Sequence, residues 1–341
     1  MAQLAEPVVH TAPPRALSSE AIAFLVMLAF IIIAPAVIYP VSLMKALCFA
    51  LFACAFNLLI GYVGLLSFGH ALFFGWAAYV CAHLAKVGAI SIPYWMAGWH
   101  WYVIAIPPLP PELAILGGTL TGAVLGLVVG AIAIRRQGIY FAMITLALAQ
   151  MMFFFAVQAP FTHGEDGIQA VPRGWLFGIF NLADQKAMYI TVSVIFLAGF
   201  LLIYRIINSP FGEVLKAIRE NEPRAISLGY KTERYKLLAF VLSTTLAGTA
   251  GATKAIVFQL ASLTDVDWPM SGEVVLMTLV GGLGTIFGPV VGAFIVIAMQ
   301  DNLAQYGQWV LVIQGVIFVL CVLLFRRGVV GEIANYFKLK L

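Results

Sequence analysis

NSPFGEVLKAIRENEPRAISLGYKTERYK, residues 208–236, is a long polar interruption between two apolar runs. Ten of its residues are charged, in a chain of 341 residues that has only 19 Lys and Arg and 15 Asp and Glu. Ser209 and Pro210 form a predicted helix cap and first-turn proline. Four apolar side chains then follow at the spacing i, i+3, i+4 and i+7, which places them in one helical stripe: Phe211, Val214, Leu215 and Ile218.

A second short helix is predicted directly after the first. Asn221 and Pro223 interrupt the first helix and can begin another, and Gly229 is a natural end for it. We therefore expect two short helices at an angle, which lie at the membrane surface between two spanning helices. We call residues 208–236 the charged hairpin. Two interpretations stand: it docks into another protein and passes force to the membrane helices, or it is an ordinary cytoplasmic loop with a solvated face.

The composition around the charged hairpin is typical of an all-α polytopic membrane protein. Hydrophobic residues make up 62% of the chain and charged residues 10%, whereas globular domains have about 25% charged residues. The apolar stretches lie at about 21–39, 41–60, 71–86, 113–134, 139–158, 187–207, 237–258, 272–300 and 308–325. This map gives a cytoplasmic tail at 1–19, a transmembrane domain at 20–330 and a second cytoplasmic tail at 331–341.

The glycine-broken stretch 272–300 decides the number of crossings. Two short helices that meet at its glycines would cross twice and give about ten crossings in all. Fourteen basic residues then lie inside and three outside (Lys86, Arg173 and Lys186), as the positive-inside rule favours. The alternative is one re-entrant half-helix plus one full span, which puts the basic C-terminus outside.

Glycines recur every fourth residue on the span 113–134, so one helix face is bare backbone that a neighbouring helix can approach closely. They are Gly118, Gly122, Gly126 and Gly130. The same four-residue spacing of glycines recurs at Gly284, Gly288 and Gly292. Static packing and helices that slide during gating are both compatible with this pattern.

Polar side chains at membrane depth are candidates for a substrate path: Asn57, Ser67, His70, Thr145 and Gln150. For each one alone, a satisfied interhelical hydrogen bond is the other interpretation. In the outer loop 159–186, Glu165 and Asp166 stand between two glycines. This turn would receive a soluble partner or a cation, or it is merely solvated.

Several classes of site have no support in the sequence. There is no phosphate-binding G-x-x-x-x-G-K-[ST] motif, so we expect ATP to be bound by partner subunits and no cofactor by this chain. We expect no metal site, because the four cysteines lie in apolar segments as packing residues. We also expect no catalytic residue. An intramembrane enzyme built on Ser67 and His70 would lack a third group. An ion-coupled carrier would need charged ligands at mid-membrane, where only Lys45 and Lys254 are present, neither with an obvious partner.

Five segments resemble the LivM-type permease of branched-chain amino acid ABC transporters. They are NLLIGYVGLLSFGHALFFGWAAY (57–79), RRQGIYFAMITLALAQ (135–150), THGEDGI (162–168), SPFGEVLKAIRENEPRAISLGY (209–230) and VVLMTLVGGLGTIFGPVVGA (274–293). The family's E-A-A…G docking pattern falls on Glu222, Ala225 and Gly229, with Pro223 in place of the usual first alanine. The resemblance makes the charged hairpin a coupling hairpin, with these residues for the ATPase: Glu213, Arg219, Glu220, Glu222, Arg224, Ala225 and Gly229.

The resemblance also implies the partners and the place of the protein. It would be a multi-pass permease of the bacterial inner membrane, surrounded by lipid, which conducts a small molecule and binds no nucleic acid. It would pair with a second homologous permease, ABC ATPase subunits and a periplasmic substrate-binding protein seated near Glu165, Asp166 and Arg173. Branched-chain amino acids are the expected substrate; urea, short-chain amides and aromatic acids are carried by similar permeases.

Overall fold

The structure, a computed structural model, describes residues 19–88, 90–94, 100–104, 107–136, 138–307, 309–324 and 328–336. The predicted tail at 1–19 therefore lies outside the described residues except for Ser19, and so do residues 337–341 of the second tail. The predicted inner residues Arg15, Arg326, Arg327, Lys338 and Lys340 also lie outside them.

Helices dominate the described part of the chain, as the composition predicted. Their bounds are α1 Ser19–Ile33, α2 Pro40–Ile60, α3 His70–Lys86, α4 Pro111–Ala133, α5 Ile139–Gln158, α6 Gln185–Ile207, α7 Pro210–Glu220, α8 Glu222–Ser227, α9 Thr232–Phe258, α10 Trp268–Gly281, α11 Gly288–Leu303, α12 Trp309–Leu324 and α13 Gly328–Tyr336. Among the described helices, α2, α4, α5, α6 and α9 are long and apolar enough to span a membrane, and α1 and α12 contain shorter apolar helices.

Within the described residues, three small antiparallel sheets in the loops add to the predicted helical architecture. Strand β1 (Ile90–Tyr94) pairs with β2 (His100–Ile104), β3 (Ile168–Gln169) with β6 (Leu260–Ala261), and β4 (Trp175–Leu176) with β5 (Phe180–Asn181). These loops leave the helices and must satisfy their own backbone groups, which strand pairing does.

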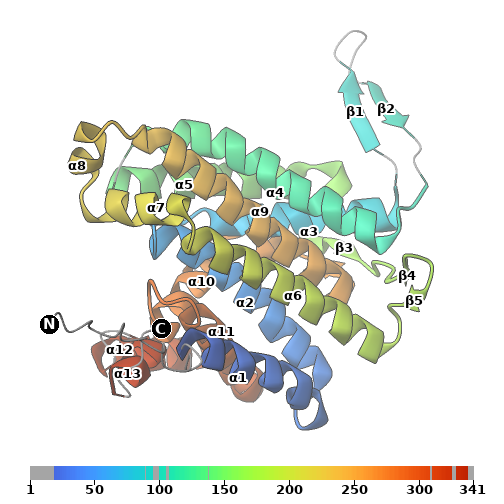
Figure 1. The fold of residues 1–341 in the computed structure, drawn as a ribbon. Coiled ribbons are helices and arrows are strands. Elements are labelled where there is room, and N and C mark those ends of the chain that lie inside the picture. Colours follow the sequence, from blue (N-terminus) through green and yellow to red (C-terminus); the bar gives the residue numbers. More distant parts are fainter. Residues whose placement is uncertain are drawn as a thin grey trace, which may run out of the picture.

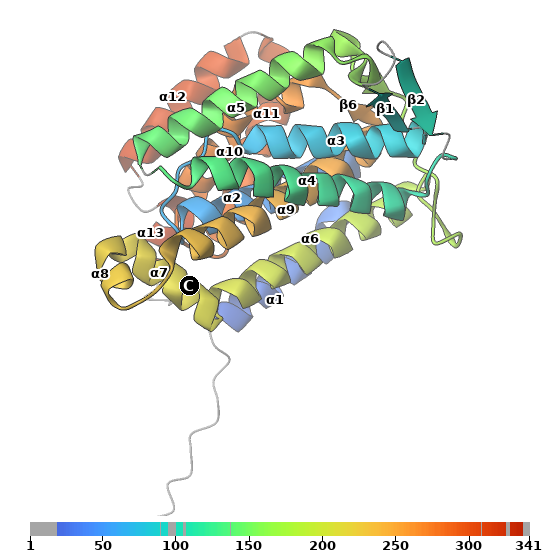
Figure 2. The same cartoon turned by 90° about the horizontal axis from the view of Figure 1, so that it is seen from above.

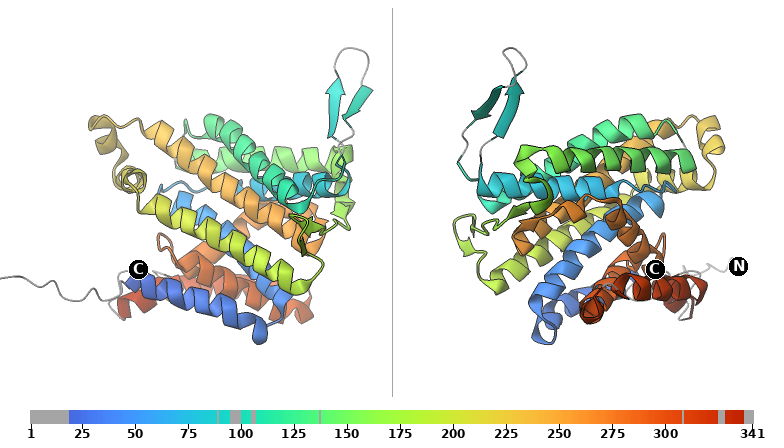
Figure 3. Two further views of the ribbon diagram at one scale, coloured as in Figure 1. Left: turned by 45° about the vertical axis from the view of Figure 1, so that its right-hand side comes forward. Right: turned by 180° about the vertical axis from the view of Figure 1, so that it is seen from behind.

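The loop sheets and the charged hairpin lie at opposite ends of the helix bundle. Figure 1 shows α7 and α8 at one end and β1, β2, β4 and β5 at the other, and both views in Figure 3 show the same separation. The bundle therefore has two chemically different ends, as expected of a protein with an inner and an outer face.

The predicted close approach along α4 is confirmed. Figure 2 shows α3, α4 and α9 running alongside one another. A Cβ on Gly118 would come within 2.6 Å of the Ala77 carbonyl oxygen on α3, and one on Gly122 within 2.7 Å of the Thr244 carbonyl oxygen on α9. Even an alanine is too large at these positions, so the glycines permit backbone-to-backbone packing.

The stretch 272–300 forms two short helices, α10 and α11, joined by residues 282–287. They pack antiparallel, because the backbone of Gly292 lies against Met277 while Gly288 lies against Gly281. Near the end of the chain, residues 328–336 form the helix α13, which includes the first part of the predicted tail. Its first residue, Gly328, packs on Gly282, and Val330 is buried.

Pro35 marks a break in the first apolar stretch. Helix α1 stops at Ile33, and the 3-10 turn η1 (Ala34–Ala36) follows. Proline has no N–H, so Pro35 cannot donate to the carbonyl of Ile31 four residues earlier. The hydroxyl of Tyr189 on α6 donates to that carbonyl instead, at 2.6 Å. This bond fastens α1 to α6 inside the apolar region.

Candidate functional site

The charged hairpin contains the two predicted helices. Ser209 caps α7 by accepting a hydrogen bond from the backbone N–H of Gly212 at 3.3 Å, and Pro210 occupies the first turn. Leu215 and Ile218 are buried, so the predicted apolar stripe of α7 does face the protein. Asn221 caps α8 by accepting from the N–H of Arg224 at 3.1 Å.

The hairpin is held firmly to the start of α9. The ring of Phe211 stacks on Tyr235 with centroids 5.7 Å apart. The carboxylate of Glu222 pairs with the Lys236 ammonium at 2.5 Å, and the Lys236 side chain is only 5% exposed. Gly229 ends the hairpin's second helix with a φ of 89°, which favours glycine. The hairpin thus presents a fixed shape.

The residues predicted to contact an ATPase divide into two groups. Glu213, Glu220, Arg224 and Gly229 are exposed and available to a partner. Arg219 is exposed too, but its guanidinium donates to the carbonyl of Gly61 at the end of α2. The other two are held within the chain: Ala225 is buried, and Glu222 is paired with Lys236.

Two apolar residues at the tip of the hairpin were not predicted. Ile226 on α8 is 55% exposed, and Leu228, which follows α8 directly, is 70% exposed. A signal was present in the sequence for Ile226 only, since the residue next to an inward-facing Ala225 on a helix points to a different side. Exposed apolar side chains at the aqueous end of a membrane protein are typical of a contact with another protein.

Of the predicted path residues, His70 lies in the centre of the bundle. It is fully buried, its Nε2 lies 2.9 Å from the Ser243 hydroxyl on α9, and that hydroxyl donates to the carbonyl of Ala55 on α2. The partner of His70 is thus Ser243 rather than Ser67. In the conformation described, His70 joins α2, α3 and α9.

Ser67 and Thr145 lie close to His70 in the fold. Both are buried, and a Cβ on Gly69 would come within 2.5 Å of the Thr145 carbonyl oxygen. Ser67 accepts from the N–H of Gly69 at 3.3 Å, and Thr145 donates to the carbonyl of Ala142 at 2.9 Å. A path role for these residues stays a prediction.

The other two predicted path residues lie apart from this group. The Gln150 amide is 3.4 Å from the Asp267 carboxylate, just before α10. Asn57 joins two loops: its amide donates to the carbonyl of Thr285 at 2.9 Å and accepts from the N–H of Gly284 at 3.1 Å. Asn57 therefore fixes the turn between α10 and α11 against the end of α2.

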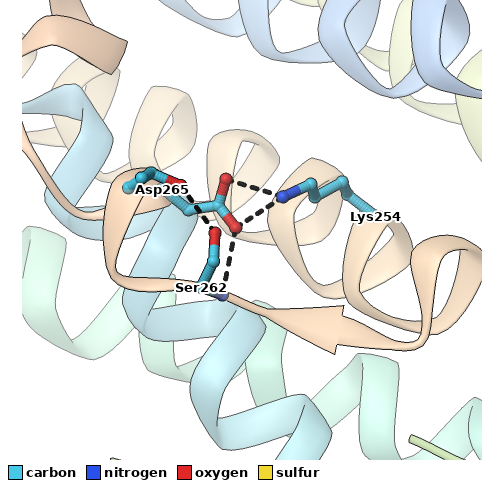
Figure 4. A network of polar contacts seen from close by, with 4 residues as sticks. Lys254, Ser262 and Asp265 are labelled. Carbon is cyan, nitrogen blue, oxygen red and sulfur yellow. Dashed lines mark hydrogen bonds and ion pairs between the residues drawn. The ribbon is translucent and has the colours of Figure 1, made fainter. Parts of the chain in front are cut away.

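The lysines inside the spans have partners, contrary to the prediction. Lys254 on α9 bonds both carboxylate oxygens of Asp265 at 2.6 Å, and Asp265 is also the capping partner of Ser262 (Figure 4). Lys45 on α2 pairs with Asp301 on α11 at 3.1 Å. Paired in this way, these lysines supply no set of free charged ligands for an ion-coupled carrier.

The outer loop presents the predicted carboxylates. Glu165 and Asp166 are exposed in the 3-10 turn η4 (Gly164–Asp166), and Gly167 has a φ of 64°. Arg173 is turned inward and donates to the carbonyl of Val257 at 2.8 Å, so it anchors the loop to α9. Four large apolar side chains nearby are more than half exposed: Trp175, Phe177, Ile179 and Phe180.

Comparison with known proteins identifies relatives along most of the chain. The model of the family described as "Branched-chain amino acid transport system / permease component" matches residues 39–322. The high-affinity branched-chain amino acid transport system permease protein LivM of Salmonella typhimurium is 24% identical over 307 residues, which cover 83% of this chain and 68% of that protein. LivM of Escherichia coli is 23% identical over 307 residues, which again cover 83% of this chain and 68% of that protein.

A sugar permease is also related. The ribose import permease protein RbsC of Bacillus subtilis is 29% identical over 202 residues, which cover 53% of this chain and 58% of RbsC. No solved structure matches the chain.

Proposed function

Because the chain belongs to the family of permease components of branched-chain amino acid transport systems, we propose that it is the LivM-type permease subunit of an ABC importer. With a second homologous permease it forms the path for branched-chain amino acids across the bacterial inner membrane. Separate ATPase subunits bind ATP, and a periplasmic binding protein delivers the substrate. The chain itself carries no catalytic residue and no cofactor.

The observation that carries this proposal, beside the family match, is the exposed tip of the charged hairpin. Arg224, Ile226 and Leu228 are exposed together, on or directly after a short helix that the Glu222–Lys236 pair holds in place. Apolar side chains at a fixed aqueous tip, with a charged neighbour, have the composition of a protein–protein contact. The tip lies at the end opposite the outer loops (Figure 1), where cytoplasmic ATPases would bind.

The same separation of ends suggests how the importer works. The binding protein docks at the outer loop near Glu165 and Asp166 and releases its amino acid into the path. ATP binding closes the two ATPases, and their movement displaces α7 and α8. The displaced helices switch the path from outward to inward access.

Ten crossings fit this arrangement. The antiparallel packing of α10 on α11 supports two crossings within 272–300, since it returns the chain to the side from which it came. It also leaves the basic C-terminal residues on the cytoplasmic side.

The test is gentle purification from the native membrane, identification of what elutes with the chain, and reconstitution in liposomes. We expect two ATPases, a related permease, and ATP-driven uptake of leucine when the matching binding protein is present. Urea, an aromatic acid and ribose complete the substrate panel. A chain that elutes alone and moves solute without ATP would overturn the proposal in favour of an ion-coupled carrier.

A further inference from the structure

One charged side chain of the charged hairpin, that of Arg219, contacts the loops at the ends of the membrane helices although the residue is partly exposed. Arg219 on α7 donates from its Nη1 to the carbonyl of Gly61, at the C-terminal end of α2. That carbonyl lies at the negative end of the helix dipole, which favours a cation. Arg219 thus links the hairpin directly to the loop 61–69, which separates α2 from α3.

The same guanidinium reaches a second loop. A Cβ on Gly284, in the turn between α10 and α11, would come within 3.2 Å of the Arg219 Nη1 and 3.4 Å of the Gly61 oxygen. A Cβ on Gly64 would come within 3.2 Å of the Arg219 Cγ. Both glycines have left-handed backbones, with φ of 80° at Gly64 and 75° at Gly284, so side chains are excluded from both positions where Arg219 lies.

The two loops are also fixed to each other. Asn57 binds the turn between α10 and α11 through two hydrogen bonds, of 2.9 Å to Thr285 and 3.1 Å to Gly284. It does so from the last turn of α2, four residues before Gly61. A force applied to either loop is therefore felt by both helix pairs, α2–α3 and α10–α11.

We propose that Arg219 is the positioning residue that transfers movement of the charged hairpin to these two helix pairs, and that it does not dock the ATPase. The inference rests on the proposed function and deepens it, because it separates the residues that bind the ATPase from the one that transmits its motion. Arginine suits this role, since its planar guanidinium offers several fixed donors where lysine offers a single flexible ammonium.

The test compares Arg219→Ala and Arg219→Lys with Lys216→Ala in the reconstituted importer. Lys216 is on the same helix, and its partner Glu213 lies on the solvent side. The measurements are ATPase co-purification, ATP hydrolysis and leucine uptake per ATP hydrolysed. Leucine uptake per ATP hydrolysed would not change if Arg219 only stabilised the fold.

We expect Arg219→Ala to keep its ATPases while uptake per ATP falls about tenfold, the effect of losing one hydrogen bond to a charged group. Arg219→Lys restores part of the coupling, because it still reaches Gly61, and Lys216→Ala resembles the wild type. Unchanged uptake per ATP in Arg219→Ala would overturn the inference. So would parallel loss of the ATPases, which would make Arg219 a docking residue.

A second pair of variants tests the inference from the opposite side of the contact. Gly284 and Gly138 both have positive φ, of 75° and 59°, but a Cβ on Gly138 meets nothing within 4 Å. Gly284→Ala should uncouple hydrolysis from uptake and Gly138→Ala should not, although both carry the same kind of backbone strain. Equal coupling in the two would contradict the inference. A wild-type importer that shows no ATP-driven uptake would instead overturn the proposed function, and the inference with it.

Discussion

Two ion pairs that join helices or loops of the bundle differ in how far they are buried. The Lys254–Asp265 pair is almost fully buried, with side chains 12% and 2% exposed (Figure 4). The Lys45–Asp301 pair is more open, at 26% and 34%. A buried pair stripped of one partner leaves an uncompensated charge in an apolar place, whereas an open pair contributes little.

We therefore expect Asp265→Asn to lower the free energy of unfolding by about 3–5 kcal/mol, and Asp301→Asn by about 1 kcal/mol or less. Thermal unfolding of the purified protein in detergent measures both. Equal losses in the two variants would mean that burial does not set the energy of these pairs.

Two neighbouring charges of the charged hairpin should also differ in effect. Arg224→Glu reverses an exposed charge, so it should abolish ATPase co-purification and leave the unfolding temperature unchanged. Glu222→Arg should lower both ATPase co-purification and the unfolding temperature. It places a second cation beside Lys236, whose side chain is only 5% exposed. Co-purification that survives Arg224→Glu would count against docking at this tip.

At the scale of helices, close packing depends on glycine in some places and not in others. Gly122→Ala puts a methyl within 2.7 Å of the Thr244 carbonyl oxygen and 3.1 Å of the Gly248 Cα, so α4 must move away from α9. The overpacking cost is about 1–3 kcal/mol. Gly272→Ala on α10 meets nothing within 4 Å and should cause no loss. The same unfolding assay applies, and a tolerated Gly122→Ala would show that α4 is free to shift.

The helices were largely predictable, because long apolar runs and local caps are short-range signals. The ends of α7 and the glycine face of α4 both follow from residues a few positions apart. The sheet β3–β6 does not, since its strands are about ninety residues apart in the chain. Neither does α13, whose packing depends on Gly282.

The candidate site was predictable only in part for the same reason. Exposure of Arg224 and the caps of α8 are local properties. The hydrogen bond of Arg219 requires Gly61, which lies 158 residues earlier, and the bond of Asn57 requires Thr285, 228 residues later. No pattern within one helix indicates such partners, so residues expected in one surface separate into a docking group and an internal group.

For the molecule as a whole, the number of crossings gives a clear test. A single cysteine in place of Gln305, in the exposed 3-10 turn η6 (Ala304–Tyr306), should react with a membrane-impermeant reagent added outside. A reporter fused to the C-terminus should be cytoplasmic. A cysteine at exposed Ser227 serves as the inner control. The re-entrant alternative predicts the reverse at both positions, an inner Gln305 and an outer C-terminus.

The exposed tip of α8 has a consequence for the life of the protein before assembly. Ile226 and Leu228 are exposed in the isolated chain. Chaperones and proteases recognise exposed hydrophobic side chains of this kind on subunits that have not yet assembled. A permease made in excess over its ATPase would remain orphaned and be degraded. The amount of assembled transporter would then be limited by the scarcer subunit. We therefore expect the permease and its ATPase to be synthesised in matched amounts.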